Sequence, residues 1–244
     1  MSRTGGTAVL ALASNKVNAL DREVLQEIAA FVEYCEQNAE VSALVLTGEG
    51  SVFSAGVNVT EVLANEKSYS SELLIDLEHA VLGLFRCAKP TVVAINGSAI
   101  AGGCLLACAC DKRLIAEEAR IGVTELQVGV AFPAATVELL RYTCGPRAEQ
   151  LMFDAQLLNA EEACRSGLAH KAVPRAELQA AAMAEAEQLA SRDARAYALA
   201  KEAARRSTLS AFEEGRRQLD HRVHEQWQDD ETRANLENLL KPKG

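Results

Sequence analysis

The sequence predicts an α/β fold in which parallel strands are joined by helices. Residues 41–47 and 91–95 are short apolar runs rich in β-branched residues, and each is followed by a turn composition containing glycine. Between them, residues 71–86 carry leucine and valine at helical spacing. Parallel neighbours need a crossover connection, which is usually a helix. This order of segments therefore predicts a parallel sheet with right-handed crossovers.

The N-terminal segment begins the same alternation. Residues 7–13 are strand-like and residues 14–18 form a polar loop. Residues 21–38 then place four apolar side chains on one helix face behind Asp21, a residue type suited to capping a helix. With Arg3 ahead of it, the first apolar run imitates a signal peptide, but it is shorter than the apolar region of such a segment. We therefore interpret it as the first strand.

The rest of the chain supplies a third strand–helix unit and then only helices. We expect a helix at 103–110, a strand at 112–116, a helix at 134–143, a last strand at 168–173, helices at 177–191 and 194–206, a long charged helix, and a terminal helix at 230–240. The three rough strand–helix units suggest a spiral of ββα-like turns. We predict a core over 1–190 and a helical oligomerisation region over 191–244.

Composition and charge exclude several classes of protein. The chain has 244 residues, of which 49% are hydrophobic and 24% are charged, so it can bury a full core and is not disordered. Its net charge of −9 is opposite to the basic face that nucleic-acid binding needs. It also has no apolar run long enough to cross a bilayer. We predict neither a nucleic acid nor a membrane as a partner.

The cysteines indicate a cytoplasmic protein without a metal site. Seven cysteines are scattered through apolar segments, and this odd, unpaired pattern suits reduced, buried thiols. Cys104, Cys108 and Cys110 lack the paired CxxC spacing and a nearby histidine.

Two segments place glycine where a strand leads into a helix, namely 53–59 and 100–105. Free backbone N–H groups at such junctions suit a developing negative oxygen, although each segment taken alone could be only a tight turn. Neither contains the Gly-Lys-Ser/Thr sequence of a nucleotide-binding P-loop. Ser54 and Ser98 do not lie in a Gly-x-Ser-x-Gly motif, so we expect no serine hydrolase. His79 lies in a mid-helix position and is not expected to be a base.

These segments together resemble the crotonase (enoyl-CoA hydratase/isomerase) superfamily. The resemblance is carried by VLTGEGSVFSAGVN at 45–58, AING at 94–97, AGGC at 101–104 and CDKR at 110–113. It implies an α/β crotonase-type spiral of ββα units with a C-terminal helical oligomerisation region. It also implies an acyl-CoA thioester substrate, no further cofactor, and a homotrimer or a dimer of trimers. The N–H groups of Val57 and Gly102 would form the oxyanion hole, and a β-branched residue at 102 would block the thioester.

The resemblance further distinguishes two reactions within the superfamily. Its hydratases use two carboxylates; here the first position is Leu105 and the second is Glu125. Hydration requires one group for water and another for the α-proton, whereas moving a double bond requires a single base. Leu105 and the segment 124–127 are similar to the mitochondrial-type 3,2-trans-enoyl-CoA isomerase branch. That branch usually has Asp at position 58 and Asn at position 124, where this chain has Asn58 and Thr124.

We therefore predict an enoyl-CoA isomerase with Glu125 as its proton shuttle. A buried glutamate beside Leu105 and Phe132 should have a raised pKa. Further substrate contacts are expected from Ala55, Gly56, Asn58, Val59, Leu105, Thr124 and Phe132, with Lys16 near the nucleotide part of coenzyme A. Asp111 is expected to anchor the strand that follows it. The alternatives are an enoyl-CoA hydratase, another acyl-CoA enzyme of the superfamily, and a non-catalytic binding protein with this fold.

Overall fold

The computed structural model describes residues 1–241 and confirms the predicted parallel α/β fold. The main sheet has the strand order β1-β2-β3-β5-β7-β10, and all of its neighbours are parallel except β1 and β2. Its strands are β1 (Ser2–Thr4), β2 (Thr7–Leu12), β3 (Ala43–Gly48), β5 (Thr91–Ile95), β7 (Lys112–Ala116) and β10 (Lys171–Val173). The runs at 41–47, 91–95 and 112–116 therefore occupy the centre of the sheet, as predicted.

A second, smaller sheet completes the spiral. Its order is β4-β6-β8-β9, parallel except for the last pair. Its strands are β4 (Val52–Ser54), β6 (Ser98–Ile100), β8 (Arg120–Gly122) and β9 (Leu158–Asn159). Each of β3, β5 and β7 is followed by one short strand of this sheet and then by helical structure. This succession is the ββα repeat that the sequence suggested.

The helices of the first 170 residues cover the sheets, and α1 shows how the sequence forms them. Asp21 caps α1 because its side chain accepts a hydrogen bond from the Val24 N–H at 3.0 Å, and the predicted apolar face packs into the core. The other helices include three that we did not expect, α2, α6 and α7. The full set is α1 (Arg22–Gln37), α2 (Val59–Ala64), α3 (Ser68–Arg86), α4 (Gly102–Ala109), α5 (Ala134–Cys144), α6 (Ala148–Asp154) and α7 (Ala160–Ser166), with short 3₁₀ turns η1 (Glu125–Val128) and η2 (Gly145–Arg147).

Hydrogen bonds join the loop after β3 to the loop after β5, and they hold two successive turns of the spiral together. Asn96 accepts a hydrogen bond from the Gly48 N–H at 3.0 Å and donates to the Gly50 carbonyl at 3.2 Å. A Cβ at Gly97 would lie 2.0 Å from the Ser51 carbonyl oxygen. Only glycine fits this close approach of two backbones.

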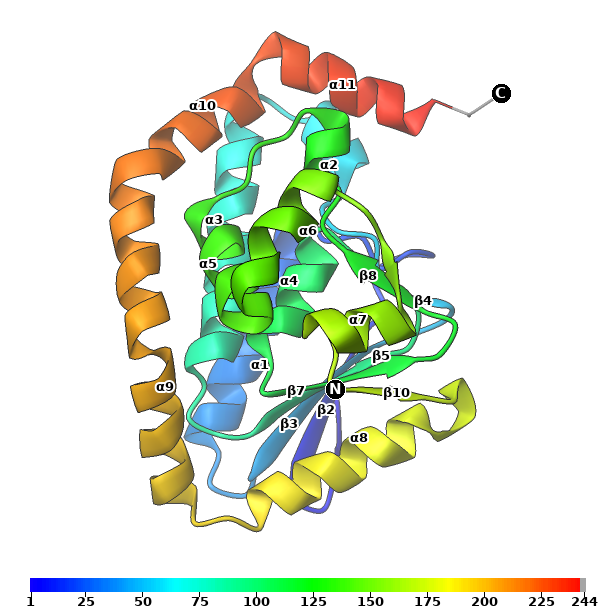
Figure 1. Ribbon diagram of the computed structural model, residues 1–244, viewed down its shortest axis with the longest axis vertical. Helices are drawn as coiled ribbons and strands as arrows, with labels where there is room; N and C mark the ends of the chain where they lie inside the picture. Colours follow the sequence, from blue (N-terminus) through cyan, green and yellow to red (C-terminus); the bar gives the residue numbers. More distant parts are fainter. Residues whose placement is uncertain (242–244) are drawn as a thin grey trace.

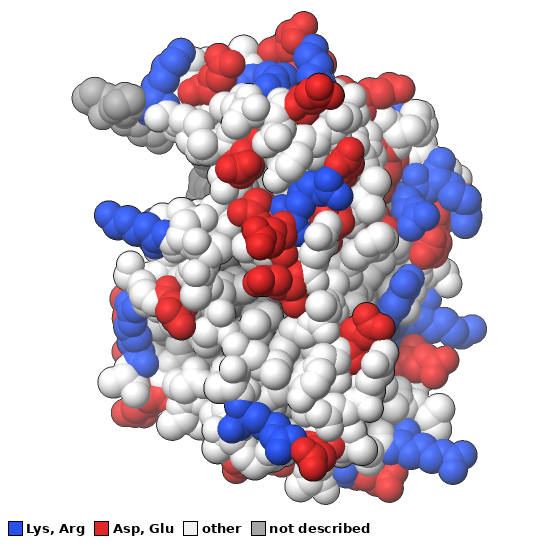
Figure 2. Space-filling model, turned by 180° about the vertical axis from the view of Figure 1, so that it is seen from behind, with Lys and Arg blue, Asp and Glu red and all other residues white. Residues whose placement is uncertain are grey.

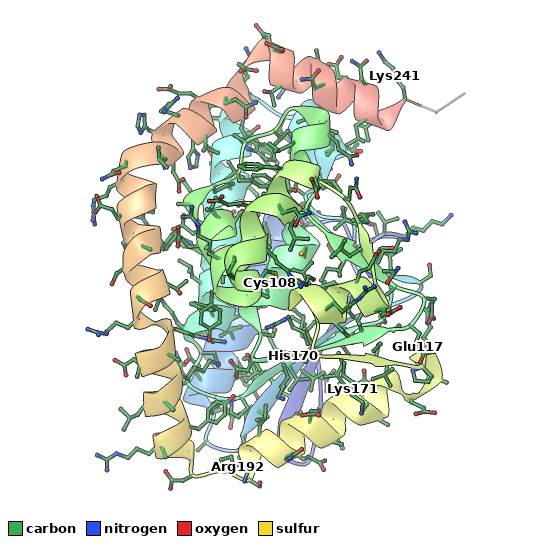
Figure 3. All side chains as sticks on the ribbon, viewed as in Figure 1. Cys108, Glu117, His170, Lys171, Arg192 and Lys241 are labelled. Atoms are coloured by element: carbon green, nitrogen blue, oxygen red, sulfur yellow. The ribbon has the colours of Figure 1, made fainter. Side chains whose placement is uncertain are left out.

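The last predicted strand begins later than expected. We predicted a strand over 168–173, but β10 starts at Lys171. The Leu168 carbonyl instead accepts a hydrogen bond from the Arg113 side chain at 3.0 Å, and His170 Nδ1 accepts one from the Arg113 N–H at 3.0 Å. Burial and then the charge of Arg113 lower the pKa of His170 to about 4, so this ring is neutral. Figure 3 labels His170 just ahead of β10.

The C-terminal part is helical, but its second helix, α9, is longer than predicted. The helices are α8 (Arg175–Ala190), α9 (Ala194–Gly215), a π-helical turn η3 (Arg216–Asp220), α10 (His221–Gln228) and α11 (Asp230–Leu240). The predicted end at 206 is wrong, because residues 207–214 contain neither glycine nor proline and the helical backbone continues to Gln228. Figure 1 shows α9 along one side of the molecule, with α10 and α11 continuing across its top.

A buried cluster around Asp111 fastens α9 to the main sheet. The Asp111 carboxylate accepts a hydrogen bond from the Thr91 N–H of β5 at 2.9 Å. It also pairs with Lys201 at 2.8 Å and Arg205 at 2.6 Å, both on α9, and accepts from the Tyr197 hydroxyl at 2.8 Å. Burial lowers the pKa of Lys201, and Asp111 opposes this effect. Asp111 thus has the expected structural role and extends it to a distant helix.

The cysteines and the surface charges are distributed as the composition of the chain suggests. All seven cysteines are free, and all but Cys164 are buried; Figure 3 labels Cys108 within α4. Acidic and basic side chains are interspersed on the face shown in Figure 2. Within residues 1–241, no helix has both the length and the apolar character that a bilayer span requires.

Candidate active site

The two glycine segments that the sequence singled out meet in the structure. Gly56 has a positive φ of 87°, and a Cβ there would lie 2.9 Å from Ala101 Cβ and 3.0 Å from the Ile100 carbonyl oxygen. Glycine is therefore required at 56 both by its backbone conformation and by the contact between the two segments. Gly103 has a similar role, since its Cβ would lie 2.7 Å from the Ser54 carbonyl oxygen.

The N–H group of Val57 is left without a partner by the local backbone pairing. Leu20 and Val57 form a parallel bridge, in which the Leu20 N–H donates to the Gly56 carbonyl and the Asn58 N–H donates to the Leu20 carbonyl, both at 2.8 Å. In such a bridge the N–H of Val57 points away from Leu20. It donates to no acceptor within the described residues 1–241.

The N–H group of Gly102 is free for a different reason. Gly102 is the first residue of α4, so its N–H has no intrahelical acceptor. The preceding Ala101 has a positive φ of 52°, a strained conformation for a residue with a Cβ, and its own N–H donates to the Gly122 carbonyl at 2.9 Å. Within the part of the chain that the structure describes, two N–H donors at adjoining backbone turns are thus available to a ligand oxygen.

Glu125 is the first residue of η1, and its carboxylate is poorly solvated. The residue as a whole is half-buried, but its Oε2 atom is buried and has no hydrogen-bond partner. Burial raises the pKa of Glu125 to about 7, although backbone hydrogen bonds at Glu125 and Thr124 oppose the rise. This confirms the expected direction of the shift. A group with a pKa near neutrality can both accept and return a proton.

A cavity of about 390 Å³ joins these groups. Its wall is mostly apolar and combines residues from the two glycine segments, from η1 and from the C-terminal helices. The lining residues are Ala55, Val57, Val59, Ile100, Ala101, Thr124, Glu125, Gln127, Val128, Val130, Leu157, Trp227, Leu236 and Leu239. An apolar cavity with a few convergent polar groups is typical of a small-molecule site.

The predicted site residues divide into two groups. Ala55, Val57, Val59, Thr124 and Glu125 line the cavity, while Gly56 and Gly102 are chain neighbours of residues that line it. The remaining four do not line it, for reasons that differ from one residue to the next.

Leu105 is buried in the hydrophobic core and Phe132 is a partly buried residue packed against it, and neither lines the cavity. Asn58 caps α2, because its side chain accepts a hydrogen bond from the Glu61 N–H at 3.3 Å. Lys16 lies on an exposed loop, and no contact links it to the cavity wall within residues 1–241. Asn58 therefore has a local structural role, and Lys16 keeps only the role that the resemblance implies.

The reason for glycine at 102 differs from the expected one. We expected a β-branched residue there to block the thioester. A Cβ at 102 would instead point at Leu20 Cδ1, 3.2 Å away, and at Leu77 Cδ1, 3.5 Å away. Glycine at this position leaves room for core side chains, so a larger residue would first displace the ends of Leu20 and Leu77.

Some residues of the cavity wall come from distant parts of the chain and were not predicted. Trp227, Leu236 and Leu239 enter the cavity wall from α10 and α11, and nothing in their local pattern distinguishes them from an ordinary buried helix face. The structural role of Asn18 was not predicted either. Its side chain donates hydrogen bonds to the carbonyls of Glu49 and Val52 at 3.0 and 2.8 Å. Its positive φ of 49° is a conformation that asparagine tolerates.

Comparisons with known proteins agree with this arrangement. The family model described as "Enoyl-CoA hydratase/isomerase" matches residues 2–240. A "Putative enoyl-CoA hydratase" of Thermus thermophilus is 36% identical over 191 residues, which cover 76% of this chain and 74% of the relative. The human "Enoyl-CoA delta isomerase 1, mitochondrial" is 31% identical over 209 residues, covering 84% and 69%. The crystal structure of human mitochondrial delta3-delta2-enoyl-CoA isomerase has a TM-score of 0.91 at 28% identity, covering 96% of this chain and 93% of that one.

Proposed function

This chain belongs to the enoyl-CoA hydratase/isomerase family of the crotonase superfamily, and we propose that it is an isomerase that moves a double bond of an acyl-CoA thioester from C3 to C2. The proposal rests on the number of carboxylates in the cavity wall. Among the described residues that line the cavity, Glu125 is the sole carboxylate. The position where the family's hydratases have their other carboxylate is Leu105, which is buried in the core.

The reaction requires one base and one site for negative charge. Ionised Glu125 removes a proton from C2 of a 3-enoyl-CoA, and the electron pair moves into a dienolate whose charge rests on the thioester oxygen. The N–H groups of Val57 and Gly102 donate hydrogen bonds to that oxygen, an interaction that strengthens as the charge develops. Protonated Glu125 then delivers the same proton to C4. The product is a 2-enoyl-CoA, and Glu125 is again ionised.

The environment of Glu125 supports this exchange. Its pKa of about 7 makes both the ionised form that removes the C2 proton and the protonated form that returns it to C4 accessible at neutral pH. The apolar wall formed by Val59, Ile100 and Leu236 suits an acyl chain. We propose that Lys16, on its exposed loop, lies near the nucleotide part of coenzyme A.

A hydratase is the second candidate, and the names of relatives favour it. Proteins from Thermus thermophilus and Bacillus subtilis that carry hydratase names are 36% and 34% identical to this chain. Hydration would require Glu125 to activate water while another group handled the α-proton. Thr124 and Gln127, the other polar residues of the cavity wall, do not ionise near neutral pH.

The test compares wild type and Glu125→Gln on a 3-enoyl-CoA and a 2-enoyl-CoA. Glutamine keeps the size of the side chain but removes the base, so isomerisation should fall by about two to four orders of magnitude. Binding of a CoA thioester, measured by calorimetry, should persist. Efficient hydration by wild type without double-bond migration, or unimpaired isomerisation by Glu125→Gln, would contradict the proposal. Thioester binding without turnover of either substrate would instead indicate a non-catalytic binding protein.

A further inference from the structure

Gln226, on α10, makes three hydrogen bonds that the reaction itself does not explain. Its Oε1 accepts a hydrogen bond from the Ala131 N–H at 3.1 Å. Its Nε2 donates to the Gly129 carbonyl at 2.6 Å and to the Thr232 hydroxyl at 2.8 Å. The amide thus pairs with both ends of the segment 129–131 as a neighbouring strand would.

The segment 129–131 is in turn bonded to Glu125. The Val130 N–H donates to the Glu125 carbonyl at 3.0 Å, and the Gly129 N–H donates to the Leu126 carbonyl at 3.3 Å. Gly129 has a positive φ of 67°, which reverses the chain at the end of η1. The backbone that carries the Glu125 carboxylate is therefore held by hydrogen bonds that lead directly to Gln226.

Apart from the backbone hydrogen bonds at Thr124 and Glu125, the carboxylate has no support from another side chain within residues 1–241. Gln127 uses its Nε2 to donate to the Ala155 carbonyl at 2.6 Å. Trp227 and Leu236 line the cavity from α10 and α11 without charge, and the Trp227 indole N–H adds a second contact to the segment 129–131 by donating to the Ala131 carbonyl at 3.1 Å. Cys104 of α4 interacts electrostatically with Glu125, but a hydrogen bond with Cys108 and burial raise the pKa of Cys104, so it stays a neutral thiol. Among residues 1–241, no lysine, arginine or histidine lines the cavity.

We propose that Gln226 is a positioning residue for Glu125: by holding the segment 129–131, its amide fixes the direction of the carboxylate and keeps water from it. This inference rests on the proposed function, because it names the group that aims the base. Small displacements of a catalytic group are costly, about a hundredfold in rate for 1 Å. A loosened segment would also admit water to Glu125, and better solvation of the ionised form would lower its pKa.

The experiment compares Gln226→Met with two matched controls. Gln228→Met makes the same change two residues along α10, where the amide donates to the Ser71 hydroxyl of α3 at 2.6 Å. Thr232→Val removes only the bond between Gln226 and α11. Each variant is assayed with a 3-enoyl-CoA across pH 5 to 9. A second measurement, independent of turnover, follows the titration of the Glu125 carboxyl carbon by NMR, with its signal assigned from its loss in Glu125→Gln.

Gln226→Met should lower kcat by about tenfold to a hundredfold with little change in KM. Its acidic limb of kcat/KM, and the NMR titration of Glu125, should move from about pH 7 toward the ordinary glutamate value. Both control variants should keep the wild-type limb and titration. If Gln226→Met does not fold, Gln226→Asn takes its place, since it keeps a neutral amide but is one methylene too short to reach both the Ala131 N–H and the Gly129 carbonyl; it should shift the titration in the same direction.

An unchanged kcat and pH limb in the Gln226 variant would overturn the inference, and so would an equal change in Gln228→Met. The failure of the proposed function is a separate outcome. If wild type does not isomerise a 3-enoyl-CoA, the NMR titration still decides: a Glu125 pKa that falls only in the Gln226 variant supports positioning, and an unchanged pKa overturns it.

Discussion

Glu125 makes the stability of the fold depend on pH. Its pKa is about 7 in the folded protein against an ordinary value of 4.5, so the folded state binds more protons than the unfolded state between these values. The free energy of unfolding therefore decreases as pH rises from about 4.5 to about 7. A shift of this size corresponds to at most about 3 kcal/mol.

Urea unfolding of wild type and Glu125→Gln at pH 5 and pH 8 tests this dependence. Glutamine has no charged form, so the variant should gain stability relative to wild type at pH 8, by up to about 3 kcal/mol, and much less at pH 5. A difference between the two proteins that stays constant across this range would show that Glu125 titrates normally.

Single residues also show where sequence reasoning reaches its limit. The raised pKa of Glu125 was predictable, because a carboxylate among apolar neighbours is destabilised when charged. The reason for glycine at 102 was not, because the direction of its missing Cβ depends on where Leu20 and Leu77 pack. Asn58 matched a substrate-contact position, yet its side chain satisfies an N–H of α2.

Among the elements, α9 depends most on a single buried group. Asp111 pairs with Lys201 and Arg205, and all three side chains are nearly inaccessible to solvent. Asp111→Asn would leave two buried cations without a countercharge, which typically costs about 3 to 5 kcal/mol. Urea unfolding should show this loss. Glu40→Gln, which breaks the exposed pair with Arg3, serves as the control and should leave stability nearly unchanged. Equal effects of the two substitutions would mean that the buried cluster does not hold α9.

The elements that the sequence predicted are those whose pattern extends over several residues. The β-branched runs of β3 and β5 and the apolar face of α1 have enough positions to show a period. The strands β4, β6 and β8 have three residues each, too few for an alternation to be visible. They exist because the spiral brings them side by side, and the hydrogen bonds of Asn96 help to fix that position.

For the whole molecule, we predict a homotrimer or a dimer of trimers. An apolar groove of about 460 Å³, lined among others by Val41, Pro90 and Leu189, lies between α1 and the start of α9. Leu199 on α9 is 56% exposed. Exposed apolar surface of this kind is typical of subunit contacts. Sedimentation velocity at micromolar concentration should give the mass of three or six chains, and a monomer would contradict the prediction.

The candidate site also belongs to the whole molecule, because its wall joins segments more than 170 residues apart, from Ala55 to Leu239. The glycine segments and Glu125 could be found from the sequence because backbone geometry and charge leave local signals. The contribution of α10 and α11 could not, since an amphipathic helix does not reveal which surface it will cover.

One residue of the cavity wall, Trp227, gives the protein a fluorescence signal that reports on the cavity. The chain contains a single tryptophan, and it is Trp227, 4% exposed, with its indole N–H bonded to the Ala131 carbonyl at 3.1 Å. All tryptophan fluorescence of the molecule therefore originates in the cavity. Occupancy by a thioester can be titrated through this emission without a label, even in a variant that has lost turnover.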